Sequence, residues 1–173
     1  MPKETTWTEK SGRWIEYYVN GNHKAHGFYV DGLQDGKWTE YYKDGQVERE
    51  WHYKRHLPDG LCVSYYTNGR VRDTGNYDRF VKIGKWVTYH ENGAIYEEGN
   101  WKRIDGQTLS VKDGKWLAYF ENGDVRAELN YKNGLKHGLN TTYTMLLSAW
   151  GVRPPDEDIY EDGVCVEMCE GDE

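Results

Sequence analysis

The chain has 173 residues, 37% of them hydrophobic, which suits one ordinary domain. Because 8 Trp and 15 Tyr stand against only 3 Phe and 3 Met, large rings rather than aliphatic side chains are expected to form the core. The net charge of −7 comes from the last 20 residues, which hold 9 acids and no Lys or Arg. No block of basic residues favours nucleic-acid binding. No apolar run in the sequence is long enough to cross a bilayer.

Residues 1–11 precede the first repeated unit and are expected to form an N-terminal cap. This stretch contains no apolar segment of the kind that directs secretion. The chain's three cysteines do not make a disulfide framework. A cytoplasmic location is therefore the simplest expectation.

A 24-residue unit recurs between residues 12 and 143. Each unit starts at a glycine, and the spacings are 24, 24, 24, 30 and 24 residues for Gly12, Gly36, Gly60, Gly84, Gly114 and Gly138. We number positions within a unit by the distance from this glycine. Position 2 is aromatic in all but one of the first five units: Trp14, Trp38, Cys62, Trp86 and Trp116. Position 5 is always tyrosine: Tyr17, Tyr41, Tyr65, Tyr89, Tyr119 and Tyr143. A fixed period of this size indicates a repeat array.

Positions 8 and 9 are Asn-Gly or Asp-Gly in the first five units, between aromatic-rich runs. Such a pair predicts a β-hairpin with a two-residue type I′ turn, in which both residues have a positive φ. With the turn at positions 8 and 9, the position numbers of two paired residues add up to 17. Position 6 should face position 11, as in Tyr42 with Val47, and the Trp at position 2 should cover the glycine at position 15 across its own hairpin, as in Trp14 with Gly27.

Side-chain alternation divides these positions between two faces of the predicted sheet. Positions 2, 6, 11, 15 and 17 form a packed tryptophan face. Positions 3, 5, 12 and 14 form a wetter tyrosine face, on which the position-5 tyrosines meet position-12 residues that include Lys24, Arg72 and Arg126. This ladder of tyrosines is interpreted either as a contact surface or as a structural link between hairpins.

The unit GKWxxYYxNGxVxxExxY, with linkers such as YKNGLKHG at 131–138, resembles the MORN-variant repeat, a bacterial relative of the membrane occupation and recognition nexus repeat. The resemblance covers about residues 12–143. It implies an all-β fold, an elongated solenoid-like array of antiparallel hairpins with about 5–6 repeats of 24 residues. It also implies an antitoxin or immunity protein that occludes a partner toxin encoded nearby. Three features depart from the pattern: Cys62, Thr144 and six extra residues within 101–114.

The insertion and the C-terminal residues leave alternatives open. The extra residues predict a longer loop, and residues 103–108 form either a contact or a neutral surface loop. Residues 144–173 are expected to form a C-terminal cap and an acidic end. Within them, TMLLSAW at 144–150 predicts a closing strand or short helix, and 159–168 predicts either a disordered tail or, preferably, one more hairpin that turns at Asp162-Gly163.

No constellation of residues predicts an enzyme, a cofactor or a metal site; Cys165 and Cys169, for example, lack a second pair of zinc ligands. The leading hypothesis is a non-catalytic protein-binding module, acting as a monomer or an end-to-end dimer. A membrane- or phosphoinositide-associated scaffold is the alternative, which the acidic end disfavours. Predicted partner contacts are the tyrosines, the bases beside them and the terminal acids: Tyr17, Tyr41, Tyr65, Tyr89, Tyr119, Lys24, Arg72, Arg126, Asp156, Glu157, Asp158, Glu161 and Asp162.

Overall fold

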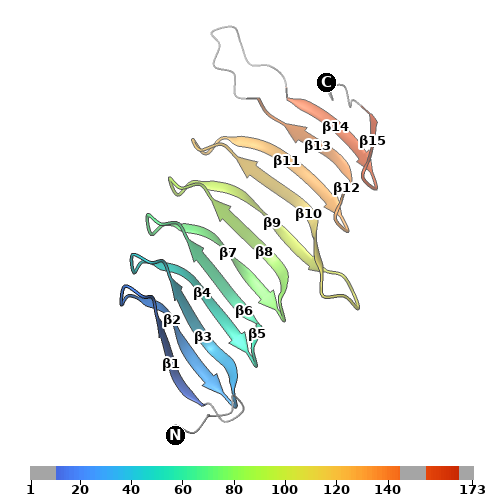
Figure 1. Cartoon of the computed structure of the whole chain (residues 1–173). Coiled ribbons are helices and arrows are strands. Elements are labelled where there is room, and N and C mark those ends of the chain that lie inside the picture. The colour runs from blue at the N-terminus through green and yellow to red at the C-terminus, as the bar shows by residue number, and fades with distance from the viewer. Residues whose placement is uncertain (1–10, 145–154, 168–173) are drawn as a thin grey trace, which may run out of the picture. The chain divides into compact units, whose positions relative to one another are not determined.

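The computed structural model describes residues 11–144 and 155–167, and every regular element in these ranges is a β-strand (Figure 1). Among these residues, no helix is both long enough and apolar enough to span a membrane. The chain divides into two compact units, Met1–Val81 and Lys82–Glu173. They are called unit 1 and unit 2, are distinct from the 24-residue repeat units, and are treated separately below. The prediction for residues 144–150 lies almost entirely outside the described residues.

Unit 1 is an antiparallel sheet with the order β1-β2-β3-β4-β6-β7, in which the short β5 pairs with β4. Consecutive long strands are neighbours, as expected for a row of hairpins. Its strands are β1 (Gly12–Tyr17), β2 (His23–Val30), β3 (Leu33–Tyr41), β4 (Val47–Lys54), β5 (Leu57–Pro58), β6 (Gly60–Tyr65) and β7 (Val71–Asp78).

Unit 2 has the same construction, with the order β8-β9-β10-β11-β13-β14-β15 and the short β12 paired with β11. The predicted all-β hairpin array is thus confirmed. The strands are β8 (Val81–Tyr89), β9 (Ile95–Arg103), β10 (Ser110–Tyr119), β11 (Val125–Lys132), β12 (Leu135–Lys136), β13 (Gly138–Thr142), β14 (Asp156–Glu161) and β15 (Val164–Glu167).

The Asn-Gly and Asp-Gly pairs at positions 8 and 9 do not form the predicted type I′ turns. Only the glycine has a positive φ, as in Gly45 at 95°, while Asp44 does not. Tyr42 accepts a bond from the Gly45 N–H at 3.0 Å, and its own N–H donates to the Gln46 carbonyl at 2.8 Å. The side chain at position 8 also accepts the N–H of position 10, at 2.9 Å for Asp44 and Gln46. This Asx bond favours a three-residue loop that ends in a left-handed glycine.

The longer loop displaces the register next to the turn by one residue. Away from the turn the predicted pairs are confirmed, for example Trp14 with Gly27. Near the turn the structure pairs Tyr41, not Tyr42, with Val47. The same shift occurs in the other four hairpins of this kind. Because directly opposed residues share a face, position 11 moves to the tyrosine face, contrary to prediction.

Type I′ turns do occur, but at the opposite ends of the strands, where one unit passes to the next. Two of them have residues other than glycine at both left-handed positions: Arg55-His56, with φ of 50° and 69°, and Arg79-Phe80, with 47° and 72°. The His56 N–H donates to the Gln34 carbonyl of the preceding hairpin at 2.8 Å. This bond helps to hold an otherwise unfavourable backbone conformation.

Replacing His56 with glycine is expected to raise the free energy of unfolding of unit 1 by about 1 kcal/mol, because glycine adopts a positive φ without steric cost. Urea denaturation measures the change. His56→Ala is the matched control, since it removes the ring but keeps the strain and should give no gain. Equal stabilisation by both substitutions would contradict this explanation.

Trp38 and Trp116 pack against the preceding hairpin rather than across their own. A Cβ atom added to Gly27 would lie closer than 3.0 Å to the indole of Trp38, and one added to Gly99 would lie equally close to Trp116. The indole N–H of Trp38 donates to the Phe28 carbonyl at 3.1 Å, so the ring ties two hairpins together. The expectation that each Trp covers the glycine of its own hairpin is therefore wrong.

The unusual Cys62 is explained by the same contact. β4 and β6 pair Glu50 with Val63, and the same register continued by one residue brings Trp51 to Cys62, so here the large residue belongs to the earlier hairpin and the small one to the later. Trp51 packs on Tyr77, with ring centroids 5.4 Å apart, and the Cys62 side chain is buried. Large and small residues exchange places between adjacent hairpins, and the space is filled in both arrangements.

The acidic end completes a sixth unit. Tyr160 pairs with Gly138 as Tyr131 pairs with Gly114, and Asp162-Gly163 forms the type I′ turn that follows, with φ of 45° and 90°. The preferred hairpin prediction for 159–168 is confirmed by the pairing of β14 with β15. The hairpin is not isolated, because β14 also pairs with β13.

Candidate protein-binding surface

The tyrosine face is ordered by bonds between neighbouring hairpins. The hydroxyl at position 5 meets position 14 of the preceding unit: Tyr65 donates to Glu50 at 3.2 Å, and Tyr119 donates to Glu98 at 2.9 Å. Tyr41 contacts His26 Nδ1 at 3.2 Å, and the two rings stack. The rings are therefore fixed in position while remaining partly accessible to a partner.

A lysine at position 1 completes each glutamate–tyrosine pair. Lys37 lies 2.5 Å from Glu50, and Lys85 lies 2.8 Å from Glu98. The Lys85 hydrogen bond, assisted by the Tyr119 hydroxyl, holds the pKa of Glu98 below its ordinary value despite partial burial. Burial, followed by the nearby Glu98 carboxylate, raises the pKa of Tyr119. The repeated lysine, glutamate and tyrosine form a charged, hydrogen-bonded row.

Glu98→Gln is expected to lower the free energy of unfolding of unit 2 by about 1 kcal/mol or less near neutral pH. Because the pKa of Glu98 is depressed in the folded state, its contribution is present above the unfolded value of about 4.3 and is lost as pH falls through the folded value. Denaturation of wild type and variant should therefore differ at pH 7 and converge below about pH 4. A difference that grows on acidification would contradict the assignment.

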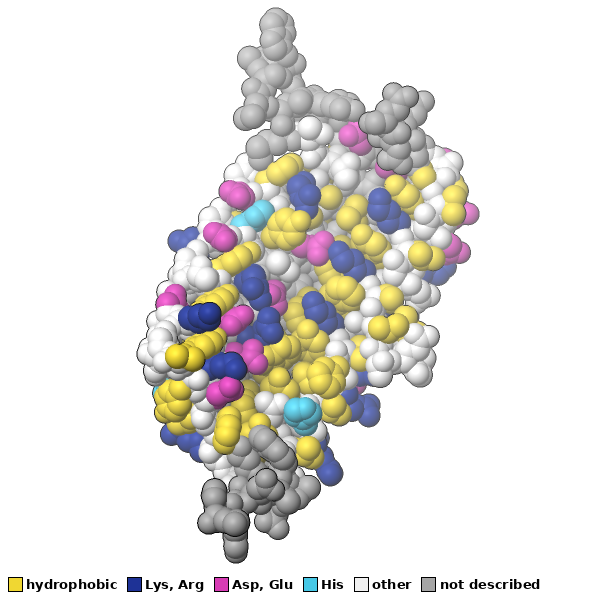
Figure 2. All heavy atoms as spheres, in the orientation of Figure 1, with side chains coloured by type: hydrophobic (Ala, Val, Ile, Leu, Met, Phe, Trp, Pro, Cys, Tyr) yellow, Lys and Arg dark blue, Asp and Glu magenta, His cyan; other side chains and the backbone are white. Residues whose placement is uncertain are grey.

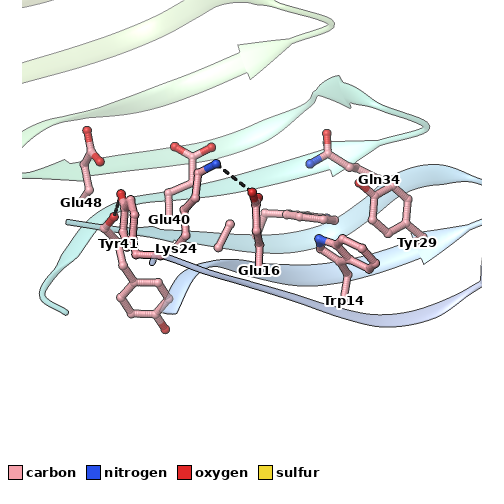
Figure 3. Close-up of a pocket in the computed structure, with 11 residues that line it drawn as sticks. Trp14, Glu16, Lys24, Tyr29, Gln34, Glu40, Tyr41 and Glu48 are labelled. Carbon is pink, nitrogen blue, oxygen red and sulfur yellow. Dashed lines mark hydrogen bonds and ion pairs between the residues drawn. The ribbon is translucent and has the colours of Figure 1, made fainter. Parts of the chain in front are cut away.

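The structure places three predicted contacts on the opposite face. Lys24, expected beside Tyr17, instead bonds to Glu16 at 2.8 Å and projects to the same side as Glu40, away from the ring of Tyr41 (Figure 3). The cause is the register shift at the turn, which leaves position 12 on the tryptophan face.

Arg72 and Arg126 depart from the prediction for the same reason. Val71 rather than Arg72 lies opposite Tyr65, and Arg72 bonds to Asp73 at 3.2 Å. Likewise Val125 rather than Arg126 lies opposite Tyr119. The guanidinium of Arg126 lies over the ring of Tyr96, 5.3 Å from its centroid. The predicted mixture of position-5 tyrosines with position-12 bases is thus wrong.

The remaining predicted contacts are accessible to different degrees. Tyr17 is 54% exposed, whereas Tyr41, Tyr65, Tyr89 and Tyr119 are half-buried. Of the acids, Asp156, Glu157, Glu161 and Asp162 are exposed and Asp158 is half-buried. Asp162 faces Lys132 at 3.9 Å and His137 at 3.7 Å. These groups lie on different elements of the two units.

The predicted loop at 103–108 is found one residue later, at 104–109, and the extra residues also extend β9 and β10. Ser110 pairs with Arg103 and Val111 with Lys102. The loop that remains is closed by a bond from the Ile104 N–H to the Leu109 carbonyl at 3.1 Å. Leu109 is 60% exposed, which leaves an apolar side chain available for contact.

Sequence reasoning missed the chemistry of the tryptophan face. Lysines two residues before the glycine lie over aromatic rings in unit 2: Lys82 is 4.1 Å from the centroid of Trp86, and Lys112 is 3.9 Å from that of Trp116. Figure 2 shows hydrophobic side chains with Lys and Arg set among them on one side of the molecule. The signal was the lysine that precedes several of the repeat glycines.

The described residues contain no group of three or more His, Cys, Asp or Glu side chains placed to hold a metal ion. Cys165 is disulfide-bonded, which the cysteine count did not predict.

Comparison with known protein families matches the MORN repeat variant at residues 34–55, 58–79, 82–103 and 112–133, about half of the chain. The chain belongs to the MORN repeat variant family. The structure adds the hairpin β1–β2 before the matched stretch and a sixth unit after it. A search of curated proteins gives no match. The family and the hairpin array together indicate a repeat-based binding scaffold.

Proposed function

We propose that this MORN repeat variant protein is an antitoxin or immunity protein that binds a partner toxin, encoded nearby, and neutralises it by occluding its active site. The observation that supports this most is the ordered tyrosine face. Its rings are held by bonds such as Tyr119 to Glu98, so the surface loses little conformational freedom on docking.

The edge formed by the Asn-Gly turns is ordered in a similar way. Asn20 donates to the Lys43 carbonyl at 2.9 Å, and Asn92 donates to the Glu121 carbonyl at 2.9 Å. Tyr18 and Tyr42 each donate a hydroxyl to the backbone of the next hairpin. Side chains at the turns therefore fix successive hairpins and keep the surface rigid.

The exposed acids of the sixth unit provide a second contact region. Glu157 and Glu161 project from β14, and Asp162 lies at the turn. Carboxylates of this kind complement the basic groove of a toxin that acts on a polyanion, and they increase the rate of encounter. The position-5 tyrosines and these acids are the contacts we propose.

Co-expression with each protein encoded beside this chain tests the proposal. We expect one neighbour to be toxic alone, to co-purify with the chain and to lose its toxicity in the complex. Tyr17→Ser, on the tyrosine face, should weaken this complex, whereas Val19→Ser, in the first turn and also exposed, serves as the matched control. Failure of every neighbour to bind, or binding without loss of toxicity, would contradict the proposed function.

A further inference from the structure

A pocket opens on the tryptophan face of unit 1, above a rung of three side chains. Ala25 lies directly opposite Glu16 on one side and Glu40 on the other. Because a methyl group separates two longer carboxylate side chains, space remains above it. Trp14 and Tyr29 line the pocket next to this rung (Figure 3).

The charges that line this pocket are predominantly negative. They comprise the carboxylates of Glu16, Glu40 and Glu48 and one ammonium, that of Lys24. Lys24 bonds to Glu16 at 2.8 Å, whereas the Arg49 guanidinium approaches Glu40 only to 4.0 Å. Carboxylates beside aromatic rings make a favourable environment for a cation.

Unit 2 has a related rung with a lysine bound to it, in which the strands are exchanged. Ala118 of β10 lies opposite Glu97 of β9, whereas in unit 1 Ala25 of β2 lies opposite Glu40 of β3. Lys112 lies 2.8 Å from Glu97, and its ammonium is 3.9 Å from the centroid of the Trp116 ring.

Unit 1 lacks this lysine. Lys112 stands two residues before Gly114, and the residue two before Gly36 is Gln34, which lines the pocket and carries no charge. In unit 1 a carboxylate from the other strand of the rung, Glu40, and the rings are present where the internal cation is replaced by a neutral amide. Lys112 thus shows which chemical group this arrangement accepts.

We propose that the pocket of unit 1 binds the ammonium group of a lysine side chain presented by a partner protein, between Glu16 and Glu40. The aliphatic stem of that lysine packs over Ala25 and against the rings, and its head lies between the two carboxylates. The proposal deepens the protein-binding function above, and it holds whether or not the partner is a toxin.

The full chain and a small probe test this binding directly. Nα-acetyl-L-lysine N-methylamide is titrated while the indole N–H signals of Trp14 and Trp38 are followed by NMR. Its norleucine analogue, which has the same stem without the ammonium, is the control. We expect saturable shifts for the lysine probe with a Kd on the order of 1–10 mM and none for the control. Equal shifts from both compounds, or none from either up to about 100 mM, would overturn the proposal.

Two substitutions use unit 2 as the template. Gln34→Lys supplies an internal cation and should weaken probe binding by about tenfold or more, whereas Gln34→Met, of similar length, should leave it nearly unchanged. Lys112→Gln should create a second site, detected as a probe-dependent shift of the Trp116 indole signal. Unchanged binding in folded Gln34→Lys together with no new site in Lys112→Gln would contradict the proposed role of this position.

The chain itself supplies lysines that compete for this pocket. Lys24 lines it and bonds to Glu16 at 2.8 Å. Lys10 stands two residues before Gly12, at the repeat position of Lys112. If the probe binds only after Lys10→Gln, the pocket belongs to the chain's own lysine and the proposal is wrong. Probe binding of similar strength with and without Lys10→Gln supports a site that is open to a partner.

Discussion

Replacing Trp116 with alanine is expected to lower the free energy of unfolding of unit 2 by about 3–5 kcal/mol. The indole is only 3% exposed and covers the backbone of Gly99. Its N–H also donates to the Asn100 carbonyl at 3.1 Å, and that carbonyl loses its partner in the variant. Chemical denaturation followed by circular dichroism measures the change, and a loss of this size approaches the whole stability of a small domain.

Trp14→Ala is the matched control for this prediction. Trp14 occupies the same repeat position in the first described hairpin, but it is only half-buried. Less apolar area returns to water on its removal, so the loss should be about half as large. Equal losses for the two tryptophans would show that packing against a preceding hairpin is not the source of the effect.

Gly99→Ala is expected to lower the free energy of unfolding of unit 2 by about 1–3 kcal/mol. This sign is informative, because alanine is ordinarily better than glycine within a strand. Here a Cβ atom would lie closer than 3.0 Å to three atoms of the Trp116 indole, which is held on all sides and must shift. Thermal or chemical denaturation measures the loss.

Making Gly99→Ala in a variant that lacks the Trp116 indole tests whether the indole causes this loss of stability. In a Trp116→Ala variant the added methyl of Gly99→Ala meets no ring, so it should cost little or even stabilise. If Gly99→Ala costs the same with and without Trp116, the destabilisation comes from the backbone and not from the indole.

The hairpins themselves were predictable from sequence because each boundary has a local cause. Asn-Gly and Asp-Gly pairs mark the turns, and the glycine that begins each unit has a positive φ, for example 72° at Gly36. The register beside the turn was not predictable from that pair alone. Two turn types fit it, and the Asx bond, such as Asn92 Oδ1 to the Ala94 N–H at 2.8 Å, selects the longer one.

Contacts between hairpins were harder to predict than contacts within them. The tryptophan was assigned to the glycine across its own hairpin because the backbone does pair those residues, as in Trp86 with Gly99. The ring that covers Gly99 is nevertheless Trp116. The missed signal was an exchange of sizes: Trp51 stands at position 15, where most other units have glycine, and Cys62 stands at position 2, where most have tryptophan.

The pairing of β14 with β13 in the sixth unit was not predicted because the length of this unit departs from the period. Tyr160 follows Gly138 by 22 residues, whereas Tyr131 follows Gly114 by 17. The register nevertheless repeats, because Asn140 lies opposite Asp158 as Trp116 at position 2 lies opposite Leu129 at position 15. The terminal acids, interpreted from composition as a separate end, are therefore part of the array.

The central claim is that adjacent hairpins are held together by one large and one small side chain whose order is interchangeable. The cycle of Trp51→Gly, Cys62→Trp and the double variant, followed by denaturation, tests it most directly. We expect each single change to destabilise unit 1, by lost packing or by overcrowding, and the double variant to recover about 1.5–3 kcal/mol relative to their sum. Losses that add to within about 0.5 kcal/mol would contradict the account.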